Sequence, residues 1–542
     1  MSTVKKQNDK NRKLYEKYTV RHALVNYYLL LMFTIFPLFA TNAYFNIRHD
    51  KYYFFIILSA VILFSEVALI LSVRSEQKKN APPEMSVTDK VWYKNFSFTD
   101  WAMIAFLVTS FISTVLSKYP LDSLFGTAGR NNGLLLTAIY VGIYFLITRY
   151  FHFMEYVFMA MAVGSALVYL LAILNCYYID PLGMFTLLTD EKTIIDFTST
   201  IGNKNLLSSF ICVTLPVLIA LSVHTKNKWF RVTYLIVSGL GFAALMTADS
   251  DSGILGMGVF LIIFFIWYSR RISRLKRYFL CLTSMLVAAK LLRLFALIMN
   301  DKSKGLDSFQ EFFVYQNSTY ILLIAFAVIT ALLYLLDNKK PDIVLTKAIP
   351  VTLGIIAGIG TLGIICAVIY FSFIDTTTQL GGIEKFLRID DKWGTHRGFM
   401  WIRSMWIFND FSFVEKLFGC GPDTFYYAFQ PYFQDLTKFG DSSTNAAHNE
   451  YINYLITIGI TGLASYLAVV GGSIARAVKA SVKNPLAIVC VAAVICYSVQ
   501  AVVNITQPIT TPLFFLFIAL CEAVARNTKL QNKNSFDTEV IK

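Results

Sequence analysis

His448 is the side chain of this sequence best suited to proton transfer. An imidazole binds a proton near neutral pH, and it is costly to leave at the mouth of an apolar membrane bundle. Asn449 follows it, and a long apolar run then begins. A helix-capping or interfacial histidine is the alternative interpretation.

Two glycines stand further along the same apolar run, at 459 and 462. If the run is one helix, the residues from 448 to 459 turn by about 1100°, so Gly459 lies nearly under His448 and Gly462 about 40° away. Glycines on that face predict the close approach of another helix, which would hold the histidine in place.

Arg397 is a second side chain of interest on the predicted outer side of the membrane. An arginine keeps its charge, and its planar fork of donors matches a phosphate pair. The segment 393–403 that contains it predicts the start of a short amphipathic helix lying on the membrane, with tryptophans at the interface. The alternative is that Arg397 extends toward lipid headgroups.

A glycine turn and a run of aromatic residues come next. Gly419 and Gly421 with Pro422 predict a tight turn. Aromatic rings near this turn can stack on the apolar faces of sugars, and anchoring at the membrane interface is the alternative. The candidates for stacking are Trp401, Phe425, Tyr426 and Tyr427.

Further cations are candidates for binding an anion such as pyrophosphate. Arg130 stands in a glycine-rich segment, 126–133, where the backbone can approach a ligand closely. Asn203 and Lys204 precede an apolar run, where helix N-terminal amides favour anions. Lys290 and Arg293 lie three residues apart inside another run, where they either bind a lipid phosphate or extend outward.

A metal is not assigned to the site. Asp249 and Asp251 form a DxD pair, which can hold a divalent ion beside a pyrophosphate, but the pattern alone is weak. The eight cysteines contain no CxxC pair that would indicate zinc.

The elements that carry these residues are predicted to be transmembrane helices. The chain has 542 residues, 56% hydrophobic and 15% charged, which excludes an ordinary soluble protein. Apolar runs long enough to cross a bilayer recur along it. We predict an all-α polytopic membrane protein with about fourteen spans, at 22–44, 52–73, 100–117, 134–149, 152–175, 205–223, 232–248, 253–269, 278–299, 318–336, 348–373, 449–475, 486–503 and 511–525.

The net charge is +14, but the positions of the basic residues along the chain match the predicted topology and do not indicate nucleic-acid binding. Lys and Arg gather before the first span and in the loops after each even-numbered span, so both termini are predicted to be cytoplasmic. The expected order is a basic cytoplasmic tail (1–21), eleven transmembrane helices (22–373), an extracytoplasmic loop (374–448), three more helices (449–525) and a cytoplasmic tail (526–542). The loop is rich in aromatics and glycine, so we expect it to fold, partly as helix, and to carry part of the active site.

With these residues in place, the chain resembles the O-antigen ligase and polymerase superfamily of bacterial envelope proteins. The likeness covers roughly residues 200–475. It rests on Arg397 with Trp401, on the turn 417–422, and on His448-Asn449 followed by Gly459 and Gly462. The chain departs from the family at 250–253, which reads Ser-Asp-Ser-Gly where relatives often carry Ser-Arg-Gly.

The resemblance implies a GT-C-like fold and a metal-independent, inverting glycosyltransferase of the bacterial cytoplasmic membrane, with no cofactor. The donor would be a glycan on a polyprenyl pyrophosphate, and the acceptor a glycan, a lipid or a protein. His448 would be the general base, and Arg397 would stabilise the departing pyrophosphate.

Two other functions remain open at this point. A protein O-oligosaccharyltransferase of the same superfamily shares the donor and differs in the acceptor. A transporter or flippase of lipid-linked glycans would place charges near the bilayer midplane, and Lys290 and Arg293 favour it.

Overall fold

The computed structural model describes residues 2–80, 95–127, 130–185, 187–300 and 302–539, with side chains inside 20–72, 95–127, 130–185, 187–300, 302–307 and 309–528. The basic side chains of the first predicted tail, apart from Arg21, and those of the loop at 74–94 lie outside this part, as do Ala128 and Gly129. Within the described residues every regular element is a helix, and one isolated bridge joins Arg271 to Val344.

Twelve helices of the described chain are long and apolar enough to cross a membrane. They are α2 (Ile47–Asn80), α3 (Phe98–Leu116), α6 (Glu155–Cys176), α8 (Lys204–His224), α9 (Lys228–Thr247), α10 (Asp251–Tyr268), α11 (Ile272–Ile298), α13 (Ser318–Lys339), α14 (Ala348–Ile369), α20 (Glu450–Ser481), α21 (Leu486–Gln500) and α22 (Thr511–Glu539). The chain is therefore the all-α polytopic membrane protein that the sequence predicts.

Two further predicted spans also coincide with helices. The first is α1 (Ser2–Leu38), and the second is α5 (Leu134–Tyr150), an apolar helix of 17 residues. Since neither is among the twelve, the count of fourteen spans stays a prediction. The helices α1 and α22 also continue into the segments predicted as the two tails.

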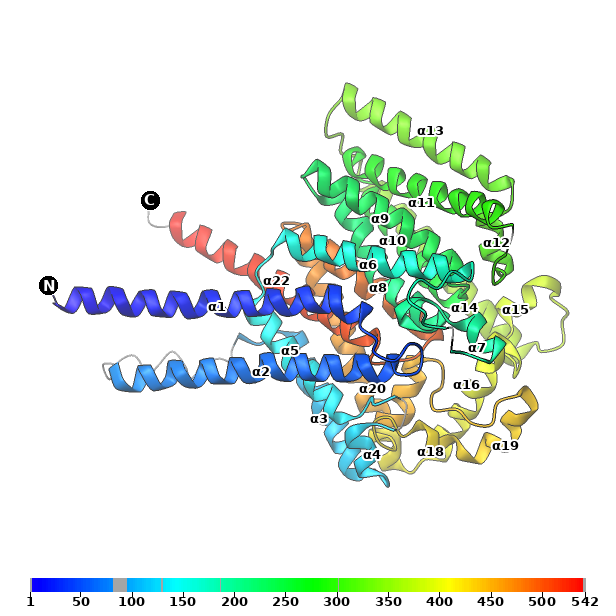
Figure 1. Ribbon diagram of the computed structural model, residues 1–542, viewed down its shortest axis with the longest axis horizontal. Helices are drawn as coiled ribbons and strands as arrows, with labels where there is room; N and C mark the ends of the chain where they lie inside the picture. Colours follow the sequence, from blue (N-terminus) through cyan, green and yellow to red (C-terminus); the bar gives the residue numbers. More distant parts are fainter. Residues whose placement is uncertain (1, 81–94, 128–129, 186, 301, 540–542) are drawn as a thin grey trace.

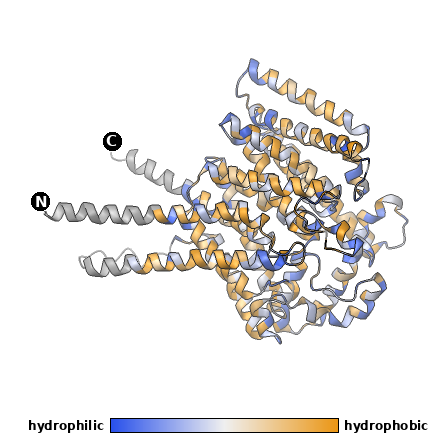
Figure 2. Ribbon diagram, viewed as in Figure 1, coloured by the Kyte–Doolittle hydropathy of each residue, from blue (hydrophilic) through white to orange (hydrophobic). Residues whose placement is uncertain are grey.

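The long helices run roughly parallel and form one bundle (Figure 1). The helix α8 is its centre, because every residue of its apolar window is buried. By contrast, no residue of α14 is buried. Apolar colour follows the helices of the bundle, while polar residues gather at their ends and in the connections (Figure 2).

The segment 374–448 forms a layer of short helices across one end of the bundle, opposite the end where both termini lie (Figure 1). Its elements are η3 (Tyr370–Ile374), η4 (Gly381–Ile383), α15 (Glu384–Leu387), α16 (Trp393–Asp410), α17 (Phe413–Phe418), α18 (Phe425–Phe429), η5 (Gln430–Tyr432), α19 (Phe433–Leu436) and η6 (Thr437–Phe439). Short helices elsewhere are α4 (Pro120–Phe125), α7 (Glu191–Asp196), η2 (Ser199–Ile201), α12 (Ser308–Val314) and η7 (Ala501–Val503).

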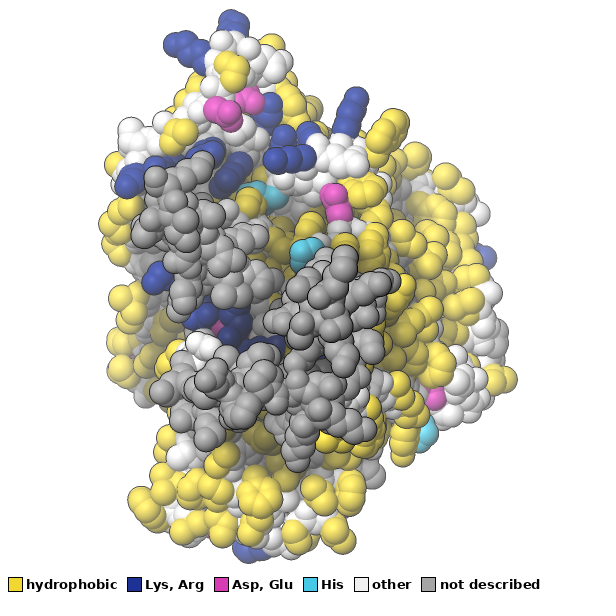
Figure 3. Space-filling view, turned by 90° about the vertical axis from the view of Figure 1, so that its left-hand side faces the viewer, with side chains coloured by type: hydrophobic (Ala, Val, Ile, Leu, Met, Phe, Trp, Pro, Cys, Tyr) yellow, Lys and Arg dark blue, Asp and Glu magenta, His cyan; other side chains and the backbone are white. Residues whose placement is uncertain are grey.

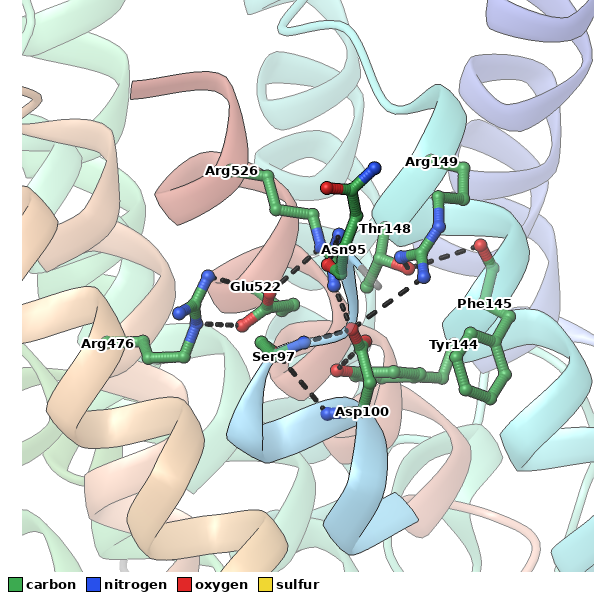
Figure 4. Close-up of polar contacts among 10 residues, drawn as sticks. All are labelled: Asn95, Ser97, Asp100, Tyr144, Phe145, Thr148, Arg149, Arg476, Glu522 and Arg526. Atoms are coloured by element: carbon green, nitrogen blue, oxygen red, sulfur yellow. Dashed lines mark hydrogen bonds and ion pairs between the residues drawn. The ribbon is translucent and has the colours of Figure 1, made fainter. Parts of the chain in front are cut away.

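The end of the bundle that bears the termini holds a buried charge network (Figure 4). Asp100 pairs with Arg526 and, at 3.7 Å, with Arg149; Glu522 pairs with Arg476 and, at 2.9 Å, with Arg526. Both carboxylates are fully buried, so each needs its partners to offset the cost of leaving water. The network joins α3, α5, α20 and α22 at the end farthest from the layer of short helices.

Candidate active site

His448 lies immediately before α20. The helix begins at Glu450, and its N-cap is Asn449, whose side-chain oxygen accepts from the N–H groups of Tyr451 and Ile452 at 3.0 Å. His448 itself has a φ of +50°, which is uncommon for a residue with a side chain. This left-handed turn directs the chain into the capped helix and leaves the imidazole outside the helix.

The expected alignment of His448 above Gly459 is wrong, because α20 is interrupted. Gly459 has φ +70° and ψ −172°, so the helical turn that the spacing argument assumed is broken there. A close approach does occur at this glycine, but the partner is a turn: a Cβ on Gly459 would lie 2.4 Å from the Leu417 carbonyl. At Gly462 the atoms nearest to an added Cβ are side-chain atoms of Ile458 in α20 itself.

The predicted glycine turn is therefore built against the break in α20. Cys420 N–H donates to Ile456 O at 3.1 Å, and Gly421 N–H donates to Thr457 O at 2.8 Å. These donors serve carbonyls beside the break. The turn thus donates two backbone hydrogen bonds to the helix, which fixes where the loop leaves the bundle.

Asp423 connects this turn to the glycine-rich segment of the first half of the chain. Its carboxylate is buried and accepts from Thr127 N–H at 2.8 Å and from Asn132 N–H at 3.0 Å. Arg130, also buried, is the nearest cation to act on it. Burial raises the pKa of Asp423 to about 6, although Arg130 and the two N–H groups oppose the rise.

A cavity of about 940 Å³ opens between the short helices and the bundle. His448 and Arg397 both line it, together with Lys204. Its other walls include Thr127, Lys192, Asp196, Asn205, Thr395, His396, Met400, Tyr426, Tyr427, Phe439 and Asp441. The two residues predicted to carry the chemistry therefore share one space, although 50 residues of sequence separate them.

The electrostatics of the cavity keep His448 neutral. Burial, together with the smaller effect of the positive charges of Arg130 and Arg397, lowers the pKa of His448 to about 3. Burial also lowers the pKa of Arg397, and the negative charge of Asp251 opposes this shift. Among the described residues, none donates to or accepts from the Arg397 guanidinium or the His448 ring. Both are available to a bound molecule.

Comparison with known proteins bears on this arrangement. Residues 312–467 match the family described as O-antigen ligase. This match supports a place in the O-antigen ligase and polymerase superfamily for that segment of the chain. The match includes Arg397, the glycine turn and His448, whereas Arg130 and Lys204 lie outside it. No curated protein matches the chain.

Inside the O-antigen ligase segment, α16 differs from the expected helix. Gly394, Thr395 and His396 have φ values of +59°, +54° and +67°, so the regular helix starts at Arg397. The Trp401 indole donates to Ala447 O at 3.0 Å and so anchors the residue before His448. The indole thus ties α16 to the His448 segment, and since Trp401 is not among the residues that line the cavity, its role in stacking on a sugar stays a prediction.

The other aromatic candidates divide into buried and accessible rings. Phe425 is 0% exposed and packs in a second apolar core, so it cannot stack on a sugar. Tyr427 lines the cavity, yet its hydroxyl donates to Asp122 at 2.6 Å and its ring stacks on Tyr119. Tyr426 also lines the cavity and keeps its role as a candidate.

The three polar residues predicted to bind an anion from the first half of the chain have different surroundings. Lys204 lines the cavity and forms ion pairs with Asp196 at 3.3 Å and Asp249 at 3.9 Å. These two carboxylates offset much of its positive charge. Asn203 caps α8 by accepting from Asn205 N–H at 2.9 Å. Arg130 stands behind the cavity wall, where its charge acts on His448.

Lys290 and Arg293 do not belong to the site, and their assignment to pyrophosphate is wrong. Lys290 donates to the carbonyls of Val314 and Gln316 at 3.2 and 2.8 Å. Arg293 donates to Tyr315 O at 3.0 Å and to Asn317 at 2.7 Å. Both cations satisfy carbonyl groups at the end of α12, where no helical donor follows.

Asp249 and Asp251 do not act as a pair. Asp249 accepts from Asp307 N–H at 2.7 Å and faces Lys204, while Asp251 begins α10. In the described part of the chain, no group of three or more His, Cys, Asp or Glu side chains is placed to hold a metal.

Two buried carboxylates near the cavity were not predicted from the sequence. One is Asp423. The other is Glu450, which is 1% exposed and accepts from the hydroxyls of Tyr466 at 2.6 Å and Tyr497 at 3.3 Å. An acid after Gly-Pro is an ordinary turn residue, and an acid in a first helical turn is ordinary too, so neither position gave a signal.

Proposed function

We propose that this O-antigen ligase family member transfers a glycan from a polyprenyl pyrophosphate to an acceptor hydroxyl on the outer face of the bacterial cytoplasmic membrane. The observation that carries the proposal is the shared cavity, in which a neutral imidazole at His448 faces the unpartnered guanidinium of Arg397. Both termini lie at the opposite end of the bundle, which agrees with termini on the cytoplasmic side.

The reaction follows from these two groups. The acceptor oxygen attacks the anomeric carbon from the side opposite to the pyrophosphate, and the carbon–oxygen bond to the pyrophosphate breaks with its electron pair. His448 takes the proton from the acceptor hydroxyl. Arg397 stabilises the charge that grows on the leaving pyrophosphate, with Arg130 contributing from behind the wall. The configuration at the anomeric carbon inverts.

The low pKa of free His448 agrees with a base that acts only when donor is bound. Two positive charges disfavour the imidazolium in the empty cavity. A bound pyrophosphate would neutralise those charges, so the proton affinity of His448 would rise when the donor arrives. Premature protonation of the base is thereby avoided.

Reconstitution tests the proposal. The full chain is placed in vesicles with a defined polyprenyl-pyrophosphate glycan, and the products are analysed by mass spectrometry. A ladder of repeats identifies a polymerase, one addition to a second lipid identifies a ligase, and addition to an added protein identifies an oligosaccharyltransferase. Movement of labelled donor across the bilayer without a new glycosidic bond would contradict the proposal. Activity that survives EDTA supports transfer without a metal.

A further inference from the structure

A second large cavity lies along the bundle at the end opposite to His448. It is a groove of about 1110 Å³ between α10 and α14, closed at one end by Ser481 and Val482 of α20. Its walls are apolar, with Ile262, Ile266 and Trp267 on one side and Leu353 and Ile364 on the other. Both helices that flank the groove are long and apolar enough to cross a membrane.

The two helices leave this groove open because they do not interlock. The buried face of α10 carries Gly253, Met257, Phe260 and Phe264, so the groove residues occupy its other face. On α14, a Cβ added to Gly354 or Gly358 would meet open space. The whole of α14 lacks buried residues, although it leads directly into the loop that carries Arg397.

Three arginines stand where the groove reaches the end of the bundle. Arg270, Arg271 and Arg274 line it, just after α10 ends. Among the described residues, none accepts a hydrogen bond or an ion pair from these three guanidinium groups. The end-on view shows Lys and Arg side chains gathered over this face and apolar side chains around its sides (Figure 3). A cationic rim thus adjoins an apolar channel.

We infer that this groove is a binding site for an anionic phospholipid, whose acyl chains fill the channel and whose phosphate meets the arginine rim. Basic pockets between transmembrane helices recognise such headgroups. The inference does not depend on the proposed function, because it concerns the other end of the bundle.

A second copy of the chain is the competing occupant, since Gly354 and Gly358 have the spacing of a helix-pairing motif. In a symmetric dimer within one membrane, however, each copy brings the same end to the interface. The arginine rims would then face each other, and like charges disfavour that pairing. The charge of the rim therefore favours the lipid.

Trp267 lines the groove and provides the measurement. The full chain is reconstituted in phosphatidylcholine vesicles that contain increasing fractions of brominated phosphatidylglycerol or brominated phosphatidylcholine. Quenching that is present in the parent protein and absent in Trp267→Phe reports lipid in the groove. We expect half-maximal quenching of this component at a fraction of phosphatidylglycerol at least about fivefold lower than that of phosphatidylcholine, because each basic residue near the surface contributes about 1 kcal/mol.

Variants assign the preference to the rim. Arg270→Gln with Arg271→Gln changes two exposed residues and should abolish most of the preference for phosphatidylglycerol; adding Arg274→Gln should remove the rest. Lys226→Gln with Lys228→Gln is the matched control, because both lysines are exposed at the same end and neither lines the groove. Circular dichroism and thermal unfolding confirm that each variant is folded.

Three results would overturn the inference. One is equal quenching of the Trp267 component by the two lipids in the parent protein. Another is a preference that survives in the folded triple variant. The third is a groove that no brominated lipid reaches while cysteine pairs on α14 cross-link two copies, which would assign the groove to a dimer.

Discussion

The backbones of Gly419 and Thr457 touch: a Cβ placed on Gly419 would lie 2.3 Å from the Thr457 carbonyl. This contact holds the glycine turn against the break in α20, and the chain on either side leads to the cavity. Gly419→Ala should therefore lower the melting temperature and the transfer rate together. The φ of +74° alone costs about 1–3 kcal/mol for a residue with a side chain.

Gly305→Ala is the control for that experiment. Gly305 has a similar φ of +84°, yet nothing lies within 4 Å of its added Cβ. A comparable loss of transfer in both variants would attribute the effect to backbone conformation and not to the contact with α20.

His448→Ala should abolish glycan transfer without changing membrane insertion or abundance, because the imidazole has no hydrogen bond from the described residues that folding would lose. Removal of a general base typically lowers the rate by about 10²–10⁴-fold. Transfer is measured by mass spectrometry and abundance by immunoblotting of membranes. Full activity would remove His448 as the base.

The pH profile is a separate test of the same residue. The pKa of His448 in the free protein is lowered to about 3, so the imidazole stays neutral as the pH falls from 8 toward 4. The ratio kcat/KM, which reports the free enzyme, should show no loss from His448 over that range. As the pH is lowered, kcat should begin to fall at a higher pH than kcat/KM does, because bound pyrophosphate favours the imidazolium and so raises the pKa of His448 in the complex. Coincident profiles would contradict the coupling of base and donor.

Arg397→Lys should lower turnover roughly 10²-fold, because lysine keeps the charge and loses the planar fork. Arg403→Lys is the matched control in the same helix. Arg403 is already held by Asp391 at 2.8 and 2.9 Å and does not line the cavity, so its loss should reduce stability more than turnover. Parent-level turnover in Arg397→Lys would reassign Arg397 to anchoring.

Asp423→Asn should lower transfer by misplacing Arg130, since a neutral amide no longer attracts the Arg130 guanidinium, although one amide oxygen can still accept from Thr127 N–H and Asn132 N–H. A double-mutant cycle with Arg130→Gln measures the link. If Asp423 acts through Arg130, the double variant should be little worse than either single variant. Additive losses of rate would show that the two residues act independently.

Glu522→Gln should destabilise the protein by about 3–5 kcal/mol, because it leaves Arg476 and Arg526 beside a neutral group in a buried network. Lys438→Gln, which breaks the exposed pair with Asp435, should change stability by less than about 1 kcal/mol. Unfolding in detergent, followed by tryptophan fluorescence, gives both values.

Much of the fold and the centre of the site could be predicted from sequence, and particular residues explain the rest. Hydropathy located the long helices because the bilayer fixes their length. The chemistry of His448 and Arg397 pointed to one site, and the cavity unites them. Periodicity gave no sign that Gly459 breaks α20, because the donors that permit the break belong to a turn 40 residues earlier. Lys290 and Arg293 were misassigned since their acceptors are carbonyls, which sequence does not reveal.

The bond from the Trp401 indole to the Ala447 carbonyl has a consequence for turnover. It joins α16, whose regular turns begin at Arg397, to the residue before His448, so we expect a shift of α16 during substrate entry to move the His448 segment with it.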